Sequence, residues 1–182
     1  MESSILIHWL LSSSQKHINL KRILNTVIII GIDPGLATVG FGVIRKEKDR
    51  IMPVSYGCIR TSPEKQNPKR LLEIYTELNI LFEKYAPSEV AVEKLFFTNN
   101  ITSAMGVSEA RGVIFLAAEL RNIPVIEYTP KQVKQAITGS GSADKKQMQE
   151  MIKRLLSLDE IPKPDDAADG LSIALCHINF RK

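Results

Sequence analysis

The stretch Val27-Ile28-Ile29-Ile30-Gly31-Ile32-Asp33-Pro34-Gly35 decides the fold of this 182-residue chain. Its continuous β-branched run is typical of a central strand that is buried on both faces, as in α/β proteins. Pro34 and Gly35 then turn the chain, which leaves Asp33 directly at the end of the strand. We therefore expect a sheet at the centre of the fold, with a carboxylate at its edge.

Two further strands follow, and then helices alternate with strands. The strand candidates at 38–45 and 51–61 are joined by a short charged turn, which predicts an antiparallel meander. The pattern then predicts a helix from Pro68 to before Pro87, a strand at 90–92, a helix at 99–122 and a strand at 125–128. Three helices are expected after these strands: one at 130–137, one that begins at a cap at 142–145 and ends at 158, and one at 165–180. The order β-β-β-α-β-α-β-α-α-α predicts an α/β domain on a mixed sheet.

The composition is that of an ordinary soluble domain. Hydrophobic residues make up 44% of the chain and charged residues 24%, which excludes a disordered chain, and no apolar run approaches the ~20 residues that span a bilayer. The net charge of +4 permits binding to nucleic acid but does not by itself indicate it. Cys58 and Cys176 lie in apolar strings, and we expect both to be reduced, buried thiols of a cytoplasmic protein.

Residues 1–26 differ from the rest of the chain. Their apolar patch is too short for a membrane anchor, lacks the basic flank of a signal peptide and is followed by a Ser-rich linker. We expect an N-terminal extension without an assigned function, either loosely docked, disordered or an artefact of an upstream start codon. The folded domain is expected at 27–182, and a chain that begins at Val27 should keep its fold.

Acidic side chains follow two of the predicted strands and open the last helix. Asp33 and Glu93 each come directly after an apolar strand; because a helical crossover lets these strands run parallel and adjacent, both acids would face one crevice. Asp166 and Asp169 are three residues apart, so both are expected on one helix face, where two intervening alanines would allow close approach to the sheet. Solvated strand ends and helix capping are the structural alternatives.

Four converging carboxylates would need cations to offset their repulsion. Oxygen ligands of this kind suit Mg²⁺ or Mn²⁺, and a pair of such ions can activate a water for phosphodiester hydrolysis. Zinc is less favoured, since Cys58, Cys176 and His177 show no ligand spacing. The acids therefore indicate a metal-dependent hydrolase.

Six short motifs follow one another between Val27 and His177. They are Ile30-Gly31-Ile32-Asp33-Pro34-Gly35, Gly57-Cys58-Ile59-Arg60-Thr61, Val92-Glu93-Lys94-Leu95-Phe96, Glu109-Ala110-Arg111-Gly112, Gln132-Val133-Lys134-Gln135 and Asp166-Ala167-Ala168-Asp169. In this order and spacing they resemble the RuvC family of Holliday-junction resolvases. The resemblance implies a ribonuclease H-like fold, with a five-stranded mixed sheet flanked by helices.

The resemblance also implies an activity and roles for residues. Asp33, Glu93, Asp166 and Asp169 would be the catalytic and metal-binding set, with two Mg²⁺ per subunit, for which Mn²⁺ could substitute. The enzyme would nick two opposed strands of a four-way DNA junction in recombination and repair, leaving 5′-phosphate and 3′-hydroxyl ends. Its expected partners are junction DNA, a second copy in a homodimer and a branch-migration motor of the RuvA and RuvB type.

Basic residues and one aromatic are the candidates for contact with DNA. Seven basic residues lie between 131 and 163 against four acidic ones, and such a face would bind phosphates without regard to sequence. The resemblance favours Lys134 and Lys145, and Lys146 adjoins them. Phe96 is expected to stack on an unpaired base. A solvated helix face for the lysines and packing at the core edge for the aromatic are the alternatives.

The predicted helix at 99–122 is apolar around its whole circumference, more than contact with one sheet requires. One side is therefore expected to bury against a second copy in a symmetric dimer, and a fully internal helix is the alternative. Arg111 within it could contact phosphate or serve at an interface or helix cap, and the sequence favours neither.

Two other functions fit parts of the pattern. An ATP-handling member of the same fold superfamily would share the first motif, but needs a second lobe that 182 residues do not provide. A non-catalytic junction-binding module would lack at least one of the four carboxylates, and all four are present. Metal-dependent junction cleavage without ATPase activity would separate the three.

Overall fold

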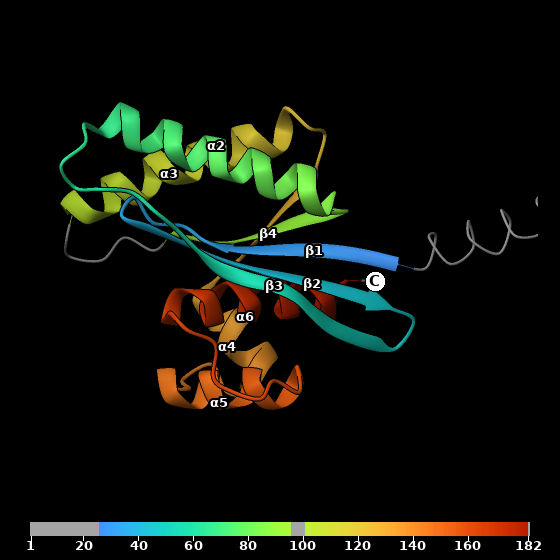
Figure 1. The fold of residues 1–182 in the computed structure, drawn as a ribbon. Helices are drawn as coiled ribbons and strands as arrows, with labels where there is room; N and C mark the ends of the chain where they lie inside the picture. Colours follow the sequence, from blue (N-terminus) through green and yellow to red (C-terminus); the bar gives the residue numbers. More distant parts are fainter. Residues whose placement is uncertain (1–25, 96–100, 182) are drawn as a thin grey trace, which may run out of the picture.

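The computed structural model describes residues 26–95 and 101–181, and its centre is a five-stranded sheet between helices (Figure 1). The strands are β1 (Thr26–Asp33), β2 (Thr38–Glu47), β3 (Arg50–Arg60), β4 (Glu89–Glu93) and β5 (Val125–Tyr128). The helices are α2 (Asn67–Tyr85), α3 (Ile101–Glu119), α4 (Pro130–Thr138), α5 (Lys145–Leu155) and α6 (Asp165–Phe180). The predicted order of elements is confirmed.

The strand order in the sheet is β3-β2-β1-β4-β5. β1 pairs with β2 and β2 with β3 in antiparallel fashion, whereas β1 pairs with β4 and β4 with β5 in parallel. This confirms both the meander and the mixed sheet. Because β1 and β4 are parallel neighbours, their last residues, Asp33 and Glu93, lie at the same edge of the sheet.

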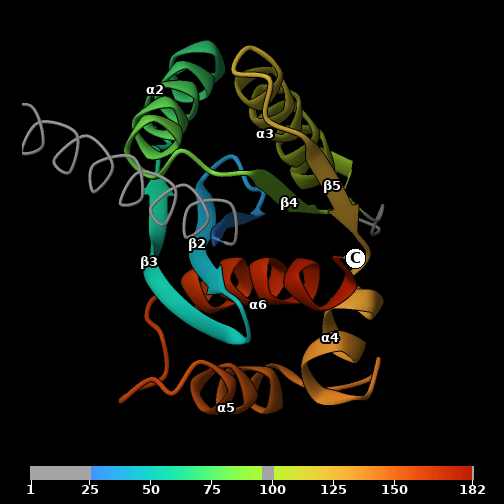
Figure 2. The ribbon, with the colours of Figure 1, turned by 90° about the vertical axis from the view of Figure 1, so that its right-hand side faces the viewer.

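Helices cover both faces of the sheet (Figure 2). α2 and α3 lie side by side on one face, and α6 lies on the other with α4 beside it and α5 on the outer side. β1 supplies both hydrophobic clusters: Ile29 packs with the α4–α6 side, and Ile30 and Ile32 pack with α2 and α3. All three isoleucines are fully buried, as expected for a strand covered on both faces. No helix within the described ranges is long and apolar enough to cross a membrane.

Two helices end earlier than the sequence pattern predicts. α3 ends at Glu119 rather than at 122, because Asn122 adopts a left-handed conformation and the next amide, of Ile123, bonds back to the Ala118 carbonyl. α5 ends at Leu155 rather than at 158, where Ser157 is left-handed. Glycine, and less often asparagine, marks such helix ends, so Asn122 is a stop signal in the sequence, whereas Ser157 is not.

α6 crosses β1 and β2 at the distance of direct backbone contact. Gly31 and Gly42 are paired in the β1–β2 ladder, and Gly170 of α6 lies against them. A Cβ on Gly31 would lie 2.2 Å from the Gly170 carbonyl oxygen, and one on Gly170 would lie 2.4 Å from the Phe41 carbonyl carbon. The expected close approach of this helix is confirmed, but glycines on both elements permit it in addition to the alanines.

We predict that Gly170→Ala destabilises the fold by about 2–3 kcal/mol, since both backbones would have to move apart. For a chain of this size that is a fall in melting temperature of about 4–12 °C. Gly57→Ala is the control, because its Cβ would meet only the tip of the Phe41 ring, at 3.2 Å. Thermal unfolding of both variants measures the difference, and equal melting temperatures would contradict the close-contact account.

Candidate active site

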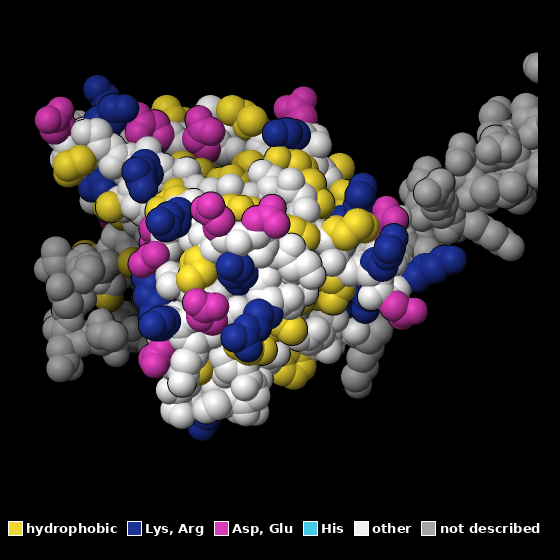
Figure 3. All heavy atoms as spheres, turned by 60° about the horizontal axis from the view of Figure 1, so that its bottom comes forward, with side chains coloured by type: hydrophobic (Ala, Val, Ile, Leu, Met, Phe, Trp, Pro, Cys, Tyr) yellow, Lys and Arg dark blue, Asp and Glu magenta, His cyan; other side chains and the backbone are white. Residues whose placement is uncertain are grey.

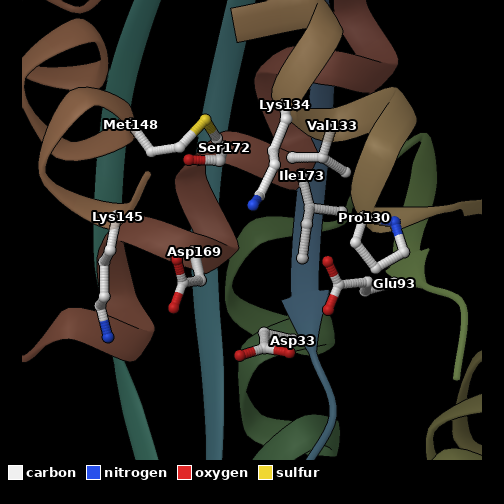
Figure 4. Close-up of a pocket in the computed structure, with 10 residues that line it drawn as sticks. All are labelled: Asp33, Glu93, Pro130, Val133, Lys134, Lys145, Met148, Asp169, Ser172 and Ile173. Atoms are coloured by element: carbon white, nitrogen blue, oxygen red, sulfur yellow. The ribbon is translucent and has the colours of Figure 1, made fainter. Parts of the chain in front are cut away.

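A pocket of about 240 Å³ opens at the sheet edge where β1 and β4 end. Three carboxylates and two lysines share this pocket with apolar walls; the lining residues are Asp33, Glu93, Pro130, Val133, Lys134, Lys145, Met148, Asp169, Ser172 and Ile173. Figure 4 shows the three carboxylates pointing toward a common space, with the Lys134 amine above it. The predicted crevice for Asp33 and Glu93 is therefore present, and Asp169 joins it.

Each wall of the pocket is set by local structure. Asp33 and Glu93 end neighbouring strands, and the glycine contact of α6 brings Asp169 to the same edge. Thr129 caps α4 by a reciprocal capping box with Gln132, which fixes the turn that carries Lys134. Asp144 caps α5 in the same way, as the sequence indicated, and Lys145 is the first residue of that helix.

The carboxylates are buried close to one another, and this disfavours their charged forms. Burial, followed by the charge of Glu93, raises the pKa of Asp33 to about 8. Burial, followed by the charge of Asp169, raises the pKa of Glu93 to about 7, and burial also raises the pKa of Asp169. Lys145 and Lys134 oppose these shifts only in part. The negative charges of these carboxylates are therefore not fully compensated by the protein, and a bound cation would stabilise their ionised forms.

The structure differs from the sequence expectation at Asp166. This residue does not line the pocket; its carboxylate accepts a hydrogen bond from Cys58 Sγ on β3, at 4.0 Å. Helix residues three apart diverge by about 60°, and this divergence is enough to turn Asp166 toward β3. Its charge still raises the pKa of Asp33. Cys58 is accordingly half-exposed rather than buried, whereas Cys176 is buried, and both are free thiols.

The three predicted lysines occupy different surroundings. Lys134 is half-buried in the pocket, Lys145 lines it while forming an ion pair with Asp165 at 2.9 Å, and Lys146 is exposed outside the lining. Figure 3 brings the α5 side forward and shows Lys and Arg mixed with Asp and Glu rather than a continuous basic patch. As candidates for phosphate contact, the two lysines that line the pocket are therefore better supported than the α5 face as a whole. Phe96 lies outside the described residues.

The acidic residues fit a divalent cation by chemical type. Over the described part of the chain, no three His, Cys, Asp or Glu side chains are gathered closely enough to hold a metal ion as they stand. The carboxylate oxygens are nevertheless the ligands that Mg²⁺ and Mn²⁺ prefer.

Sequence reasoning did not identify the apolar walls of the pocket. Val133 and Met148 are buried on the inward faces of α4 and α5. The amphipathic pattern of each helix predicts that these side chains face inward. Only the packing of α4 and α5 against α6 turns that inward face into the wall of an acidic pocket.

Comparison with known proteins places this architecture in a family. A family model for the crossover junction endodeoxyribonuclease RuvC matches residues 29–177. The protein of that name from Brevibacillus brevis is 58% identical over 153 residues, which cover 84% of this chain and 92% of that protein. The one from Pseudothermotoga lettingae is 52% identical over 155 residues, covering 85% of this chain and 96% of that protein.

Solved structures agree with these matches. Thermus thermophilus RuvC in complex with a Holliday junction substrate superposes with a TM-score of 0.81 at 34% identity, covering 85% of this chain and 94% of that chain. The yeast mitochondrial Holliday junction resolvase Ydc2 has a TM-score of 0.62 at 16% identity, over 84% of this chain and 79% of that chain, and shares the fold. The predicted ribonuclease H-like fold is thus confirmed, and the chain belongs to the RuvC family of crossover junction endodeoxyribonucleases.

Proposed function

We propose that this chain is a Holliday-junction resolvase, an endonuclease that nicks two opposed strands of a four-way DNA junction. The observation that carries the proposal is the pocket that joins Asp33, Glu93 and Asp169 with two lysines in a chain of the RuvC family. An ATP-handling protein and a non-catalytic binding module are not favoured, because the relatives are endonucleases and the acidic residues are all present.

The four acidic residues would hold two divalent cations, Mg²⁺ or Mn²⁺. Bound cations of this kind lower the pKa of an attacking water and stabilise the leaving oxygen. Asp33, Glu93 and Asp169 would supply ligands from inside the pocket, and Asp166 from its β3 side. Cleavage would leave 5′-phosphate and 3′-hydroxyl ends that a ligase can seal.

The lysines would hold the DNA backbone beside the acidic residues. Lys134 projects into the pocket between Asp169 and Glu93 (Figure 4), where its ammonium group can pair with a phosphate as a point charge. Lys145 would exchange Asp165 for a phosphate, and the exposed Lys146 would contact the backbone farther out. Phe96 remains our candidate for stacking on an unpaired base at the junction centre.

A homodimer is part of the proposal, since one substrate offers two scissile strands. α3 is not an internal helix: Ala110, Ile114 and Ala117 are fully buried, but Met105, Leu116 and Leu120 are 62%, 55% and 61% exposed. Met105 and Leu116 are eleven residues, or three turns, apart and so lie on one face of α3, and Leu120 follows directly after the helix. A second copy would bury this apolar face. A branch-migration motor of the RuvA and RuvB type and a cytoplasmic location complete the proposal.

We predict that Asp33→Asn, Glu93→Gln, Asp166→Asn and Asp169→Asn each lower junction cleavage at least about 100-fold, because loss of a charged ligand weakens the cation site. The assay is a synthetic mobile four-way junction with Mg²⁺, with cuts mapped on all four strands. Binding to the junction in EDTA should change little. Asp165→Asn is the control and should cleave normally. Wild-type rates in any of the first three variants would contradict the assignment.

We predict that Asp33→Asn stabilises the metal-free protein more at pH 8 than at pH 4. The pKa of Asp33 is about 8 in the folded protein, above its ordinary 3.8, so the folded state keeps a proton that the unfolded chain releases. The resulting stability is present in full below pH ~4 and is lost as the pH rises through about 8. Melting temperatures in EDTA of wild type and variant measure this difference, and parallel pH profiles would count against it.

We predict that Leu116→Glu yields a monomer at micromolar concentration, because a buried charge would oppose closure of the apolar α3 face. Light scattering gives the mass. Leu155, the last residue of α5, is also exposed, and Leu155→Glu serves as the control that should remain dimeric. A wild-type monomer, or a dimeric Leu116→Glu, would refute this interface.

A further inference from the structure

Arg111 of α3 contacts the end of β4 from the face of the sheet opposite the pocket. Its Nη1 donates to the main-chain carbonyl of Glu93, and its Nη2 pairs with the Glu127 carboxylate. The guanidinium carbon also lies 5.0 Å from the centre of the Phe115 ring. The Arg111 side chain is only 13% exposed. Three separate groups therefore fix this guanidinium in one position.

The alternation of side chains along β4 and β5 explains why Arg111 reaches the main chain and not the carboxylate of Glu93. Ala91 packs with the α4–α6 cluster and Val92 with the α2–α3 cluster, so the side chain of Glu93 points to the α6 side. On β5, Val125 packs with the α2–α3 cluster, which places Glu127 on the same side as Arg111. The Arg111–Glu127 pair thus stands directly behind the pocket.

The direction of the Glu93 carboxylate depends on the main chain that carries it. Among the described residues, no side chain or amide forms a hydrogen bond with that carboxylate. The strand end itself is fixed from two sides: the Lys94 amide donates to the Tyr128 carbonyl of β5 at 2.7 Å, and Arg111 holds the Glu93 carbonyl from α3. Without the second contact, this last peptide of β4 would be held only through the Lys94 amide, from the β5 side.

We propose that Arg111, oriented by Glu127, is a positioning residue that aims the Glu93 carboxylate into the pocket by holding its main-chain carbonyl. The inference rests on the proposed function, because the aim of Glu93 matters only if this residue binds a cation. Groups that orient a metal ligand affect metal affinity by about 10–100-fold when they are removed. This assignment replaces the phosphate, interface and capping roles that the sequence left open for Arg111.

Arg111 could instead have a purely structural role, in which it only holds α3 against the sheet. A second arginine–glutamate contact on the same strand allows an experiment to distinguish the two roles. Arg181 donates to the Glu89 carboxylate at 3.0 Å, and Glu89 is the first residue of β4 as Glu93 is the last. Arg181→Gln therefore removes a guanidinium–carboxylate contact from β4 at the end away from the pocket.

The experiment compares Arg111→Gln, Arg111→Lys, Glu127→Gln and Arg181→Gln in the full-length protein. Mn²⁺ binding without DNA is measured by electron paramagnetic resonance of the free ion, alongside melting temperature in EDTA, junction affinity in EDTA and cleavage rate. Arg111→Gln should weaken Mn²⁺ binding about 10-fold or more and lower kcat at unchanged junction affinity. Arg111→Lys and Glu127→Gln should fall between this variant and wild type, and Arg181→Gln should bind Mn²⁺ normally.

Wild-type Mn²⁺ binding by folded Arg111→Lys and Glu127→Gln, or by folded Arg111→Gln, would overturn the positioning role. Equal losses of Mn²⁺ binding in Arg111→Gln and Arg181→Gln would also overturn it, since the effect would then be one of general destabilisation. The two intermediate variants keep the test decisive if Arg111→Gln fails to fold. Failure of the wild-type protein to bind Mn²⁺ or cleave the junction would overturn the proposed function itself, and is recognised without any variant.

Discussion

The contact between α6 and the β1–β2 ladder is the constraint on which the rest of the structure depends. Gly31 and Gly42 face Gly170 with no room for a single Cβ between them. This contact fixes the height of α6 above the sheet, and α4 and α5 in turn pack against α6. The pocket exists because an acidic helix approaches two strand ends more closely than ordinary side chains would permit.

The same contact creates an electrostatic problem that defines the site. Asp33, Glu93 and Asp169 come from three elements and are partly removed from water in one pocket. Burial and mutual repulsion hold the pKa of Asp33 near 8 and that of Glu93 near 7. The fold thus holds carboxylates where their ionised forms are unfavourable. Such strongly shifted pKa values are typical of functional sites, and here they indicate a site for a positively charged ligand.

The two faces of the sheet have different roles in the proposed enzyme. The α4–α6 side carries the acidic residues and the lysines that would meet DNA, whereas the α2–α3 side carries the exposed apolar residues of α3. Arg111 connects them, because it belongs to α3 and holds the main chain of Glu93. A perturbation of α3 can therefore reach the pocket through a single side chain.

The sequence by itself determined the element order, the mixed sheet and the meeting of Asp33 with Glu93, because a β-branched run buried on two faces and a helical crossover admit few other topologies. It also marked the family through six ordered motifs. Tertiary structure alone decided that Asp166 turns away from the expected crevice to Cys58 while Asp169 stays in it, and that Arg111 contacts the main chain of Glu93. Local periodicity fixes which way a side chain leaves its own element, but the neighbour that it meets depends on the packing of elements far apart in the chain.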